Sequence, residues 1–323
     1  MKHQETQDVS ISDFKVAILI PCYNEAPAIH KTVSDFKREV PEGIVYVFDN
    51  SSTDRTPEIA RAAGARVVHA PLRGKGNVVR RMFADIDADI YLMADGDSTY
   101  DTGSAPKLID KLLHENLDMV VGCRVDQGAA ETYRPGHRFG NRILTKSVQR
   151  IFGGQFTDML SGYRAFSRRY VKSFPGLSTG FEIETELTIH ALELRMPCGE
   201  LATPYHARPE ASHSKLSTYR DGLRILKTIA RMYMVERPLQ FFCMIGFVFA
   251  CISVLLAFPL FMEYLETGLV PRMPTAVLSV GLMLSGQLAI VCGFVLDTVT
   301  RGRHELRRIA YLACPGLPIS AKP

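Results

Sequence analysis

The chain has 323 residues, 46% of them hydrophobic, which is enough for one sizeable domain and a further segment. Its net charge of +4 points only weakly to phosphate-bearing partners, and we expect no nucleic acid among them. Seven scattered cysteines without a CxxC pair disfavour a zinc site and a disulfide framework. The first 13 residues are polar and lack a signal-peptide core, so the front of the chain should stay in the cytosol.

Strands and helices alternate in the first part of the chain. Apolar runs predict strands at residues 14–21, 44–48, 65–69, 90–94, 119–122 and 165–166. Helices are predicted at residues 28–40 and 57–63, from about 75 to 87, and from 181 onward. Strands that are apolar on both faces are typical of a parallel sheet covered by helices, so the fold class is α/β.

Polar clusters follow three of the predicted strands, at residues 23–25, 49–54 and 95–97. Ligands of open parallel sheets bind beyond the carboxyl ends of the strands, so these clusters indicate one shared site. Asp95 and Asp97 are separated by one glycine, and residues two apart on a strand point to the same side. Two convergent carboxylates suit Mg²⁺ or Mn²⁺ holding substrate phosphates, although Asp-Gly-Asp by itself is also typical of a turn.

Lys75 lies between two glycines at a predicted helix start. Exposed N–H groups, the helix dipole and one ammonium can together hold a phosphate. The alternative is a flexible turn with a solvated lysine. The spacing of a P-loop is absent.

Two predicted helices, at residues 138–152 and 222–237, are basic and amphipathic. Such helices are typical of a membrane surface, although a solvated face on a packing helix has the same pattern. The polar loop at residues 208–215 could close its cations over a phosphate or leave them solvated. Glu182 and Glu184 begin an acid-rich helix, where glutamates are often only partners of the dipole.

Residues 238–262 and 275–295 are apolar and long enough to cross the hydrocarbon core as two helices. Arginines flank the outer ends of both, so the positive-inside rule places the domain before these helices and both termini in the cytosol. We therefore expect a multi-pass protein of the inner or cell membrane. The predicted organisation is a polar tail (1–13), an enzyme domain (14–220), a juxtamembrane helix (221–237), two transmembrane helices (238–300) and a basic tail (301–323).

Four motifs occur in order, at residues 21–25, 49–54, 74–76 and 95–97. The set resembles the family 2 glycosyltransferases of GT-A fold, over residues 16–216. Within that family the chain is most similar to the polyprenyl-phosphate glycosyltransferases, which include dolichyl-phosphate mannose synthase. The resemblance implies a GT-A, mostly parallel sheet with flanking helices, followed by two C-terminal transmembrane helices similar to those of bacterial members.

The resemblance also implies roles for individual residues. The nucleotide-sugar site comprises Pro21, Tyr23, Glu25, Asp49, Asp54, Lys75 and Asp95, with Asp49 on the base and Asp54 supporting its loop. Asp95 and Asp97 form the DxD element and Asp97 ligates the metal directly. Arg124 faces the phosphates, so the catalytic set is Asp97, Asp95 and Arg124.

Two departures from the family pattern accompany these roles. Asn50 replaces the second aspartate of the base-binding loop, which removes one charge near the nucleotide. Thr99 stands where many members have a glutamine able to reach the metal.

The implied activity is inverting transfer of a hexose from UDP-glucose or GDP-mannose to an undecaprenyl or dolichyl phosphate, at the membrane. A lipid phosphate is largely ionised near neutral pH, so it needs cations rather than a strong base. The cations expected to hold the acceptor phosphate are Arg124, Arg134, Arg138 and Lys215.

We consider three alternative functions for the chain. A processive polysaccharide synthase is excluded because the chain has no tryptophan for the QxxRW motif. Transfer to a sugar hydroxyl of a lipid-linked glycan would need a base, for which Glu182 and Glu184 are the candidates. A non-catalytic membrane scaffold with a degenerate transferase domain is the third. A homo-oligomer is left open.

Overall fold

A computed structural model of the chain describes residues 10–126, 149, 153, 156–180, 182–206 and 233–317. The chain divides into two compact units. Unit 1 consists of Met1–Leu223 together with Arg307–Pro323, and unit 2 consists of Arg224–Leu306. Residues from the end of the chain therefore belong to the unit that begins it.

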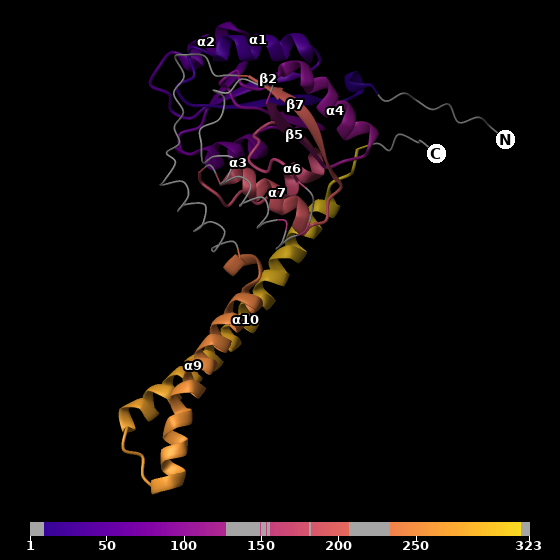
Figure 1. Ribbon diagram of the computed structural model, residues 1–323. Coiled ribbons are helices and arrows are strands. Elements are labelled where there is room, and N and C mark those ends of the chain that lie inside the picture. The colour runs from indigo at the N-terminus through magenta and orange to yellow at the C-terminus, as the bar shows by residue number, and fades with distance from the viewer. Residues whose placement is uncertain are drawn as a thin grey trace, which may run out of the picture. The chain divides into compact units, whose positions relative to one another are not determined.

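In the described part of unit 1, the strands form one seven-stranded sheet in the order β3-β2-β1-β4-β6-β5-β7 (Figure 1). The strands are β1 (Val16–Cys22), β2 (Ile44–Asp49), β3 (Arg66–His69), β4 (Ile90–Met93), β5 (Met119–Asp126), β6 (Arg164–Ser167) and β7 (Cys198–Tyr205). All neighbours pair in parallel except β6, which is antiparallel to β4 and β5. The sheet is mostly parallel, which confirms the predicted fold class.

Helices cover both faces of this sheet (Figure 1). They are α1 (Ile29–Glu39), α2 (Thr56–Ala62), α3 (Lys75–Asp85), α4 (Ala105–His114), α6 (Arg168–Ser173) and α7 (Ile183–Glu193), with short 3-10 turns at Ile11–Asp13 and Thr102–Ser104. Helix α1 buries Ile29, Val33 and Phe36, whose spacing places them on one helical face. These side chains pack with Ile18 and Ile20 of β1, so the sequence pattern directly produces the core.

Unit 2 contains helices α9 (Pro238–Thr267) and α10 (Met273–Ala313), of which the last residues belong to unit 1. Small residues let the two helices approach closely: a Cβ on Gly246 would lie 2.7 Å from the Gly286 carbonyl oxygen. The Ser253 hydroxyl donates to the Ser279 carbonyl oxygen at 2.7 Å.

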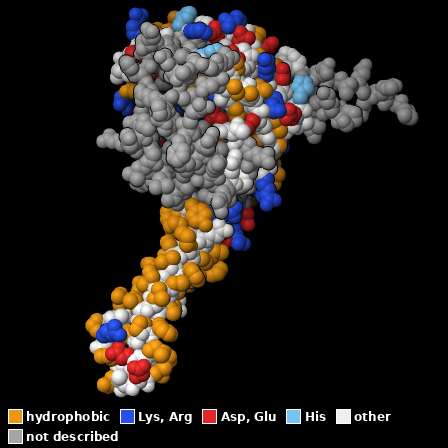
Figure 2. All heavy atoms as spheres, in the orientation of Figure 1, with side chains coloured by type: hydrophobic (Ala, Val, Ile, Leu, Met, Phe, Trp, Pro, Cys, Tyr) orange, Lys and Arg blue, Asp and Glu red, His pale blue; other side chains and the backbone are white. Residues whose placement is uncertain are grey.

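Large apolar side chains cover the outer surface of α9 and α10 (Figure 2). Both helices are long and apolar enough to cross a membrane, and only 11% and 17% of their most apolar windows are buried. A soluble core helix would bury most of such a window, so these surfaces are suited to an apolar solvent.

A fully buried carboxylate connects the end of α10 to the sheet of unit 1. Asp118 accepts hydrogen bonds from Ser167 Oγ (2.6 Å), Arg169 Nε (2.5 Å), Arg169 Nη2 (2.9 Å) and the Tyr311 hydroxyl (2.7 Å). The guanidinium of Arg169 also lies 4.8 Å from the centre of the Tyr311 ring. We call Asp118, Ser167, Arg169 and Tyr311 the Asp118 cluster. One turn earlier in α10, Arg307 pairs with buried Glu193 of α7.

Several predicted features lie outside the described residues. Of the two basic helices predicted at residues 138–152 and 222–237, only residues 149 and 233–237 are described. Arg134, Arg138 and Lys215 also lie outside the described residues.

Candidate functional site

The carboxyl ends of β2, β1 and β4 lie side by side in the sheet. Cys22 pairs with Asp49 across β1 and β2, and Leu19 pairs with Met93 across β1 and β4. The loops that follow these strands hold residues 23–25, 49–54 and 95–97. The topology thus brings the three predicted polar clusters to one edge.

Hydrogen bonds join the loop after β1 to the loop after β2. Asn24 accepts from the Thr53 backbone N–H at 2.8 Å, and the Glu25 backbone N–H donates to Thr56 Oγ1 at 2.9 Å. Asp54 accepts from the Ala26 backbone N–H at 3.2 Å and from the Thr56 hydroxyl at 2.5 Å. Burial opposes the charge of Asp54, but these hydrogen bonds lower its pKa, so the carboxylate stays ionised and cross-links the loops.

Of the predicted nucleotide-binding residues, Pro21 and Tyr23 lie at the end of β1 and just beyond it. The guanidinium of Arg73 lies 5.4 Å from the centre of the Tyr23 ring. Asp49 is buried and accepts from the Ser52 backbone N–H at 3.2 Å. Pro21 and Asp49 thus lie at the carboxyl ends of neighbouring strands.

Asn50 connects the end of β2 to the loop that carries Lys75. Its amide nitrogen donates to the Ala70 and Leu72 carbonyl oxygens at 2.9 and 2.7 Å, and its oxygen accepts from the Gly74 N–H at 2.8 Å. A carboxylate here would face two carbonyl oxygens without a proton to donate. Asn50 is therefore a structural cross-link of the site, a role that the sequence did not reveal.

Gly74 and Gly76 let the start of α3 pack closely against the segment before α7. A Cβ on either residue would lie 2.1 or 2.2 Å from the carbonyl oxygens of Thr179 and Ser178. Gly74 also has a φ of +117°, which an L side chain rarely adopts. The two glycines thus place Lys75 firmly instead of making a flexible turn.

Lys75 bridges two carboxylates from separate elements. Its Nζ lies 2.5 Å from Asp95 Oδ1, after β4, and 2.6 Å from Glu184 Oε1, in the first turn of α7. The side chains of Lys75 and Glu184 are 11% and 6% exposed, and that of Asp95 is 29% exposed. We call Lys75, Asp95 and Glu184 the Lys75 cluster. Glu182, by contrast, is the N-cap residue of α7.

Asp97 follows Asp95 by two residues, in the turn after β4, and is only 3% exposed. Its Oδ1 accepts from the Thr99 backbone N–H at 3.2 Å and from the Thr99 hydroxyl at 2.6 Å. Thr99, which replaces a family glutamine, therefore orients this carboxylate within the DxD turn.

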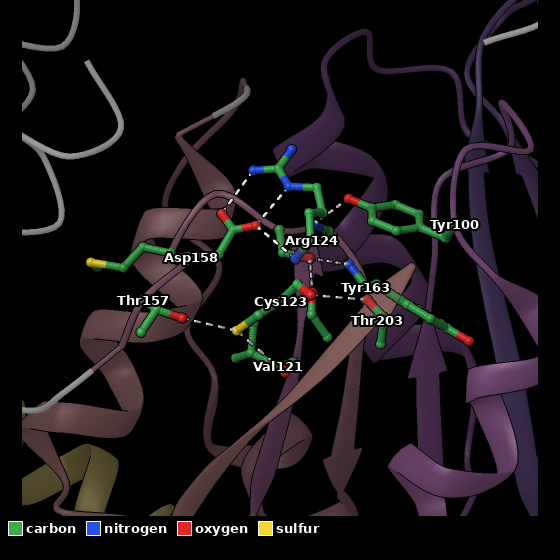
Figure 3. Close-up of polar contacts among 12 residues, drawn as sticks. Tyr100, Val121, Cys123, Arg124, Thr157, Asp158, Tyr163 and Thr203 are labelled. Atoms are coloured by element: carbon green, nitrogen blue, oxygen red, sulfur yellow. Dashed lines mark hydrogen bonds and ion pairs between the residues drawn. The ribbon is translucent and has the colours of Figure 1, made fainter. Parts of the chain in front are cut away.

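Arg124 of β5 forms an ion pair with Asp158, an acid that the sequence analysis did not single out (Figure 3). Its Nε and Nη2 donate to Asp158 Oδ2 and Oδ1 at 2.6 and 2.7 Å. The guanidinium also lies 5.6 Å from the centre of the Tyr205 ring. In the same view, the Tyr100 hydroxyl accepts from the Gly162 N–H at 2.9 Å. Residues 158–162 thus orient side chains of the site.

The fully buried Arg164 holds the surrounding backbone. It donates to the carbonyl oxygens of Ser161 (2.8 Å), Met159 (2.6 Å) and Glu184 (3.0 Å), and to Thr188 Oγ1 (2.9 Å). Burial lowers the pKa of this guanidinium, and the four acceptors satisfy its N–H groups away from water. The one sequence signal was a charge at the start of an otherwise uncharged strand, Arg-Ala-Phe-Ser.

Comparisons with known proteins agree with this geometry. Residues 17–174 match the family described as Glycosyl transferase family 2. Glycosyltransferase AglJ of Haloferax volcanii is 34% identical over 92% of this chain and 98% of its own length. A dolichyl-phosphate hexose transferase of the same organism is 31% identical over 69% of this chain and 95% of its own length.

Among solved structures, glucosyl-3-phosphoglycerate synthase from Mycobacterium tuberculosis, in complex with Mn²⁺, UDP and phosphoglyceric acid, has a similar fold. Its TM-score is 0.55 at 23% identity, covering 68% of this chain and 78% of that chain. At this identity the likeness concerns the fold alone.

Proposed function

Because the chain belongs to glycosyl transferase family 2, we propose that it transfers a hexose from a nucleotide-diphosphate sugar to a polyprenyl phosphate at a membrane. Family membership makes the chain a glycosyltransferase, whose domain we place at residues 14–220. The observation that carries the proposal is one sheet edge where Lys75, Asp95 and Asp97 lie beside the loops after β1 and β2. The named activity of the Haloferax volcanii hexose transferase supports the lipid acceptor.

The residues after β4 fit a divalent cation, Mg²⁺ or Mn²⁺. Asp95 and Asp97 supply hard carboxylate oxygens two residues apart, and Thr99 orients one of them. When bound there, the cation supplies electrostatic stabilisation of the departing nucleotide diphosphate. The Mn²⁺ and UDP complex of the solved synthase supports this assignment.

The remaining chemistry belongs to the side chains of this chain. An oxygen of the lipid phosphate forms a bond to the anomeric carbon while the bond from that carbon to the diphosphate oxygen breaks, which inverts the configuration. Lys75 stabilises the leaving diphosphate, and Arg124, oriented by Asp158, positions the acceptor phosphate. We extend this acceptor site to Arg134, Arg138 and Lys215.

One contact favours the lipid phosphate over a sugar hydroxyl as acceptor. A hydroxyl would require a general base, and Glu184 is the carboxylate placed to provide one. Its Oε1 already accepts from Lys75 at 2.6 Å. An acceptor that is ionised beforehand leaves that ion pair intact.

Helices α9 and α10 provide the membrane anchor in this proposal. The catalytic domain and both termini face the cytosol, where a nucleotide sugar is available, and the short loop between the helices lies outside. Arg301, Arg303 and Arg308 follow the apolar part of α10 and support this orientation.

The experiment uses membranes containing the full chain, Mg²⁺ or Mn²⁺, and a short polyprenyl phosphate. Labelled UDP-glucose and GDP-mannose are offered separately, and transfer is followed as acid-labile label in the organic phase. Label from one donor, lost in Asp97→Ala, supports the proposal and names the sugar. Binding of nucleotide without transfer to the lipid phosphate would instead point to a hydroxyl acceptor.

A further inference from the structure

Charge in the Lys75 cluster is unevenly balanced. One ammonium contacts two carboxylates, and Asp97 adds a third acid from the same turn as Asp95. Within the Lys75 cluster, one positive charge thus faces two negative charges. Lys75 therefore neutralises only part of this negative charge, which a divalent cation would neutralise in full.

The cluster leaves Lys75 little freedom to move away. A Cβ on Gly162 would lie 3.1 Å from Lys75 Nζ and 3.0 Å from Asp95 Oδ2, so the backbone of residue 162 closes one side. Gly74 and Gly76 fix the other end of the side chain through their contacts with residues 178 and 179.

Resting on the proposed function, we propose that Lys75 is the internal counter-ion of the metal site and competes with the divalent cation for Asp95. Before substrate binds, Lys75 occupies Asp95. When the cation arrives with the nucleotide, Lys75 releases Asp95 and stays beside the diphosphate because Glu184 retains it. Glu184 is thus a positioning residue for Lys75.

This arrangement couples the binding of the divalent cation to the binding of the nucleotide diphosphate. Free cation must displace an ammonium from Asp95, whereas cation bound with a diphosphate offers that ammonium a new partner. The nucleotide therefore raises the affinity for the cation, and by linkage the cation raises the affinity for the nucleotide equally.

The test measures Mn²⁺ binding to the purified full chain in detergent, from the free-ion signal in electron paramagnetic resonance, without nucleotide and with UDP. Lys75→Met removes the competitor, so nucleotide-free Mn²⁺ should bind about tenfold tighter than to wild type. Glu184→Gln leaves Asp95 as the sole carboxylate on Lys75, so nucleotide-free Mn²⁺ should bind about threefold weaker.

The matched control is Arg73→Met, which removes a cation two residues earlier that lies over Tyr23. Its Mn²⁺ affinity should stay within about twofold of wild type, because a more distant exposed charge is screened. Equal Mn²⁺ affinities of wild type and Lys75→Met overturn the inference, as does an equal gain in Arg73→Met. If Lys75→Met does not fold, a gain in affinity in Glu184→Gln overturns it.

Failure of this inference differs from failure of the proposed function. Mn²⁺ affinities that follow the predicted order, without transfer to any lipid phosphate, would overturn only the lipid acceptor. Transfer that depends on Asp97, with unchanged Mn²⁺ affinity in Lys75→Met, would overturn only the counter-ion.

Discussion

The Lys75 cluster and the Asp118 cluster are two buried groups of charged side chains in unit 1, and they differ in how the negative charge is met. Asp118 is fully buried and accepts four hydrogen bonds, two of them from the cation Arg169. In the Lys75 cluster two carboxylates share one ammonium, and Asp97 follows Asp95 by two residues. Saturated charge at Asp118 holds elements together, whereas excess negative charge at Asp95 is suited to binding a cation.

Changing an aspartate to asparagine in each region separates cation binding from structural support. The largest expected effect is that of Asp97→Asn. Asp97→Asn removes one negative charge but keeps an oxygen that accepts from Thr99. We expect transfer to fall on the order of 10³-fold or more, about 4 kcal/mol in the barrier, because the metal site loses a ligand charge. Thermal unfolding should be unchanged. Activity near the wild-type level in the label-transfer assay would contradict the proposed role of Asp97 in the metal site.

Asp118→Asn is the matching change in the other cluster. Arg169, which is only partly exposed to solvent, loses its charged partner, so stability should fall by about 2 kcal/mol. The midpoint of thermal unfolding reports this loss. Transfer per folded molecule should be retained, and a specific loss of kcat without destabilisation would move Asp118 into the site.

Arg124→Lys tests the ion pair of Arg124 and Asp158, which is hydrogen-bonded like the Asp118 cluster and is proposed to bind a substrate. Lysine keeps the charge but cannot donate to both oxygens of Asp158 in the planar arrangement seen here. The KM for polyprenyl phosphate should rise about tenfold, equivalent to about 1.4 kcal/mol, while affinity for UDP is unchanged. An unchanged KM would mean that Arg124 only supports the fold.

Tyr311→Phe carries the smallest expected effect. It removes one neutral donor to Asp118 and keeps the ring under Arg169, so stability should fall by about 1 kcal/mol. Tyr264→Phe is the control, because Tyr264 is 50% exposed. Equal unfolding midpoints for the two variants would show that the hydrogen bond from Tyr311 to Asp118 does not stabilise unit 1.

Much of the fold could be predicted because its strands are short apolar runs. The runs near residues 18, 46, 92 and 120 became β1, β2, β4 and β5, and their polar ends met at one edge. Strand β7 was missed because Cys-Gly-Glu-Leu-Ala-Thr-Pro-Tyr has neither an apolar run nor clear alternation. The antiparallel direction of β6 depends on its neighbours, and its four residues do not encode it.

The site was predictable only where its chemistry is local. Asp95 and Asp97 stand two residues apart after an apolar run, so the sequence alone marks them as a pair. Their geometry is that of a turn and not of a strand, because β4 ends at Met93. Asp158 lies 34 residues from Arg124, and Tyr311 lies 193 residues from Asp118. Such pairs depend on how elements distant in sequence pack together, and residue spacing does not predict that packing. The cross-linking role of Asn50 could not be predicted for the same reason, since its three partners lie in the loop after β3.

The contacts of Tyr311 and Arg307 also bear on how the protein is made. Unit 1 is discontinuous in sequence, because Arg307–Pro323 follows the whole of unit 2. A ribosome therefore synthesises α9 and the apolar part of α10 before the residues that saturate Asp118 and pair with Glu193. Unit 1 can acquire these last contacts only after the apolar segments of unit 2 have been made.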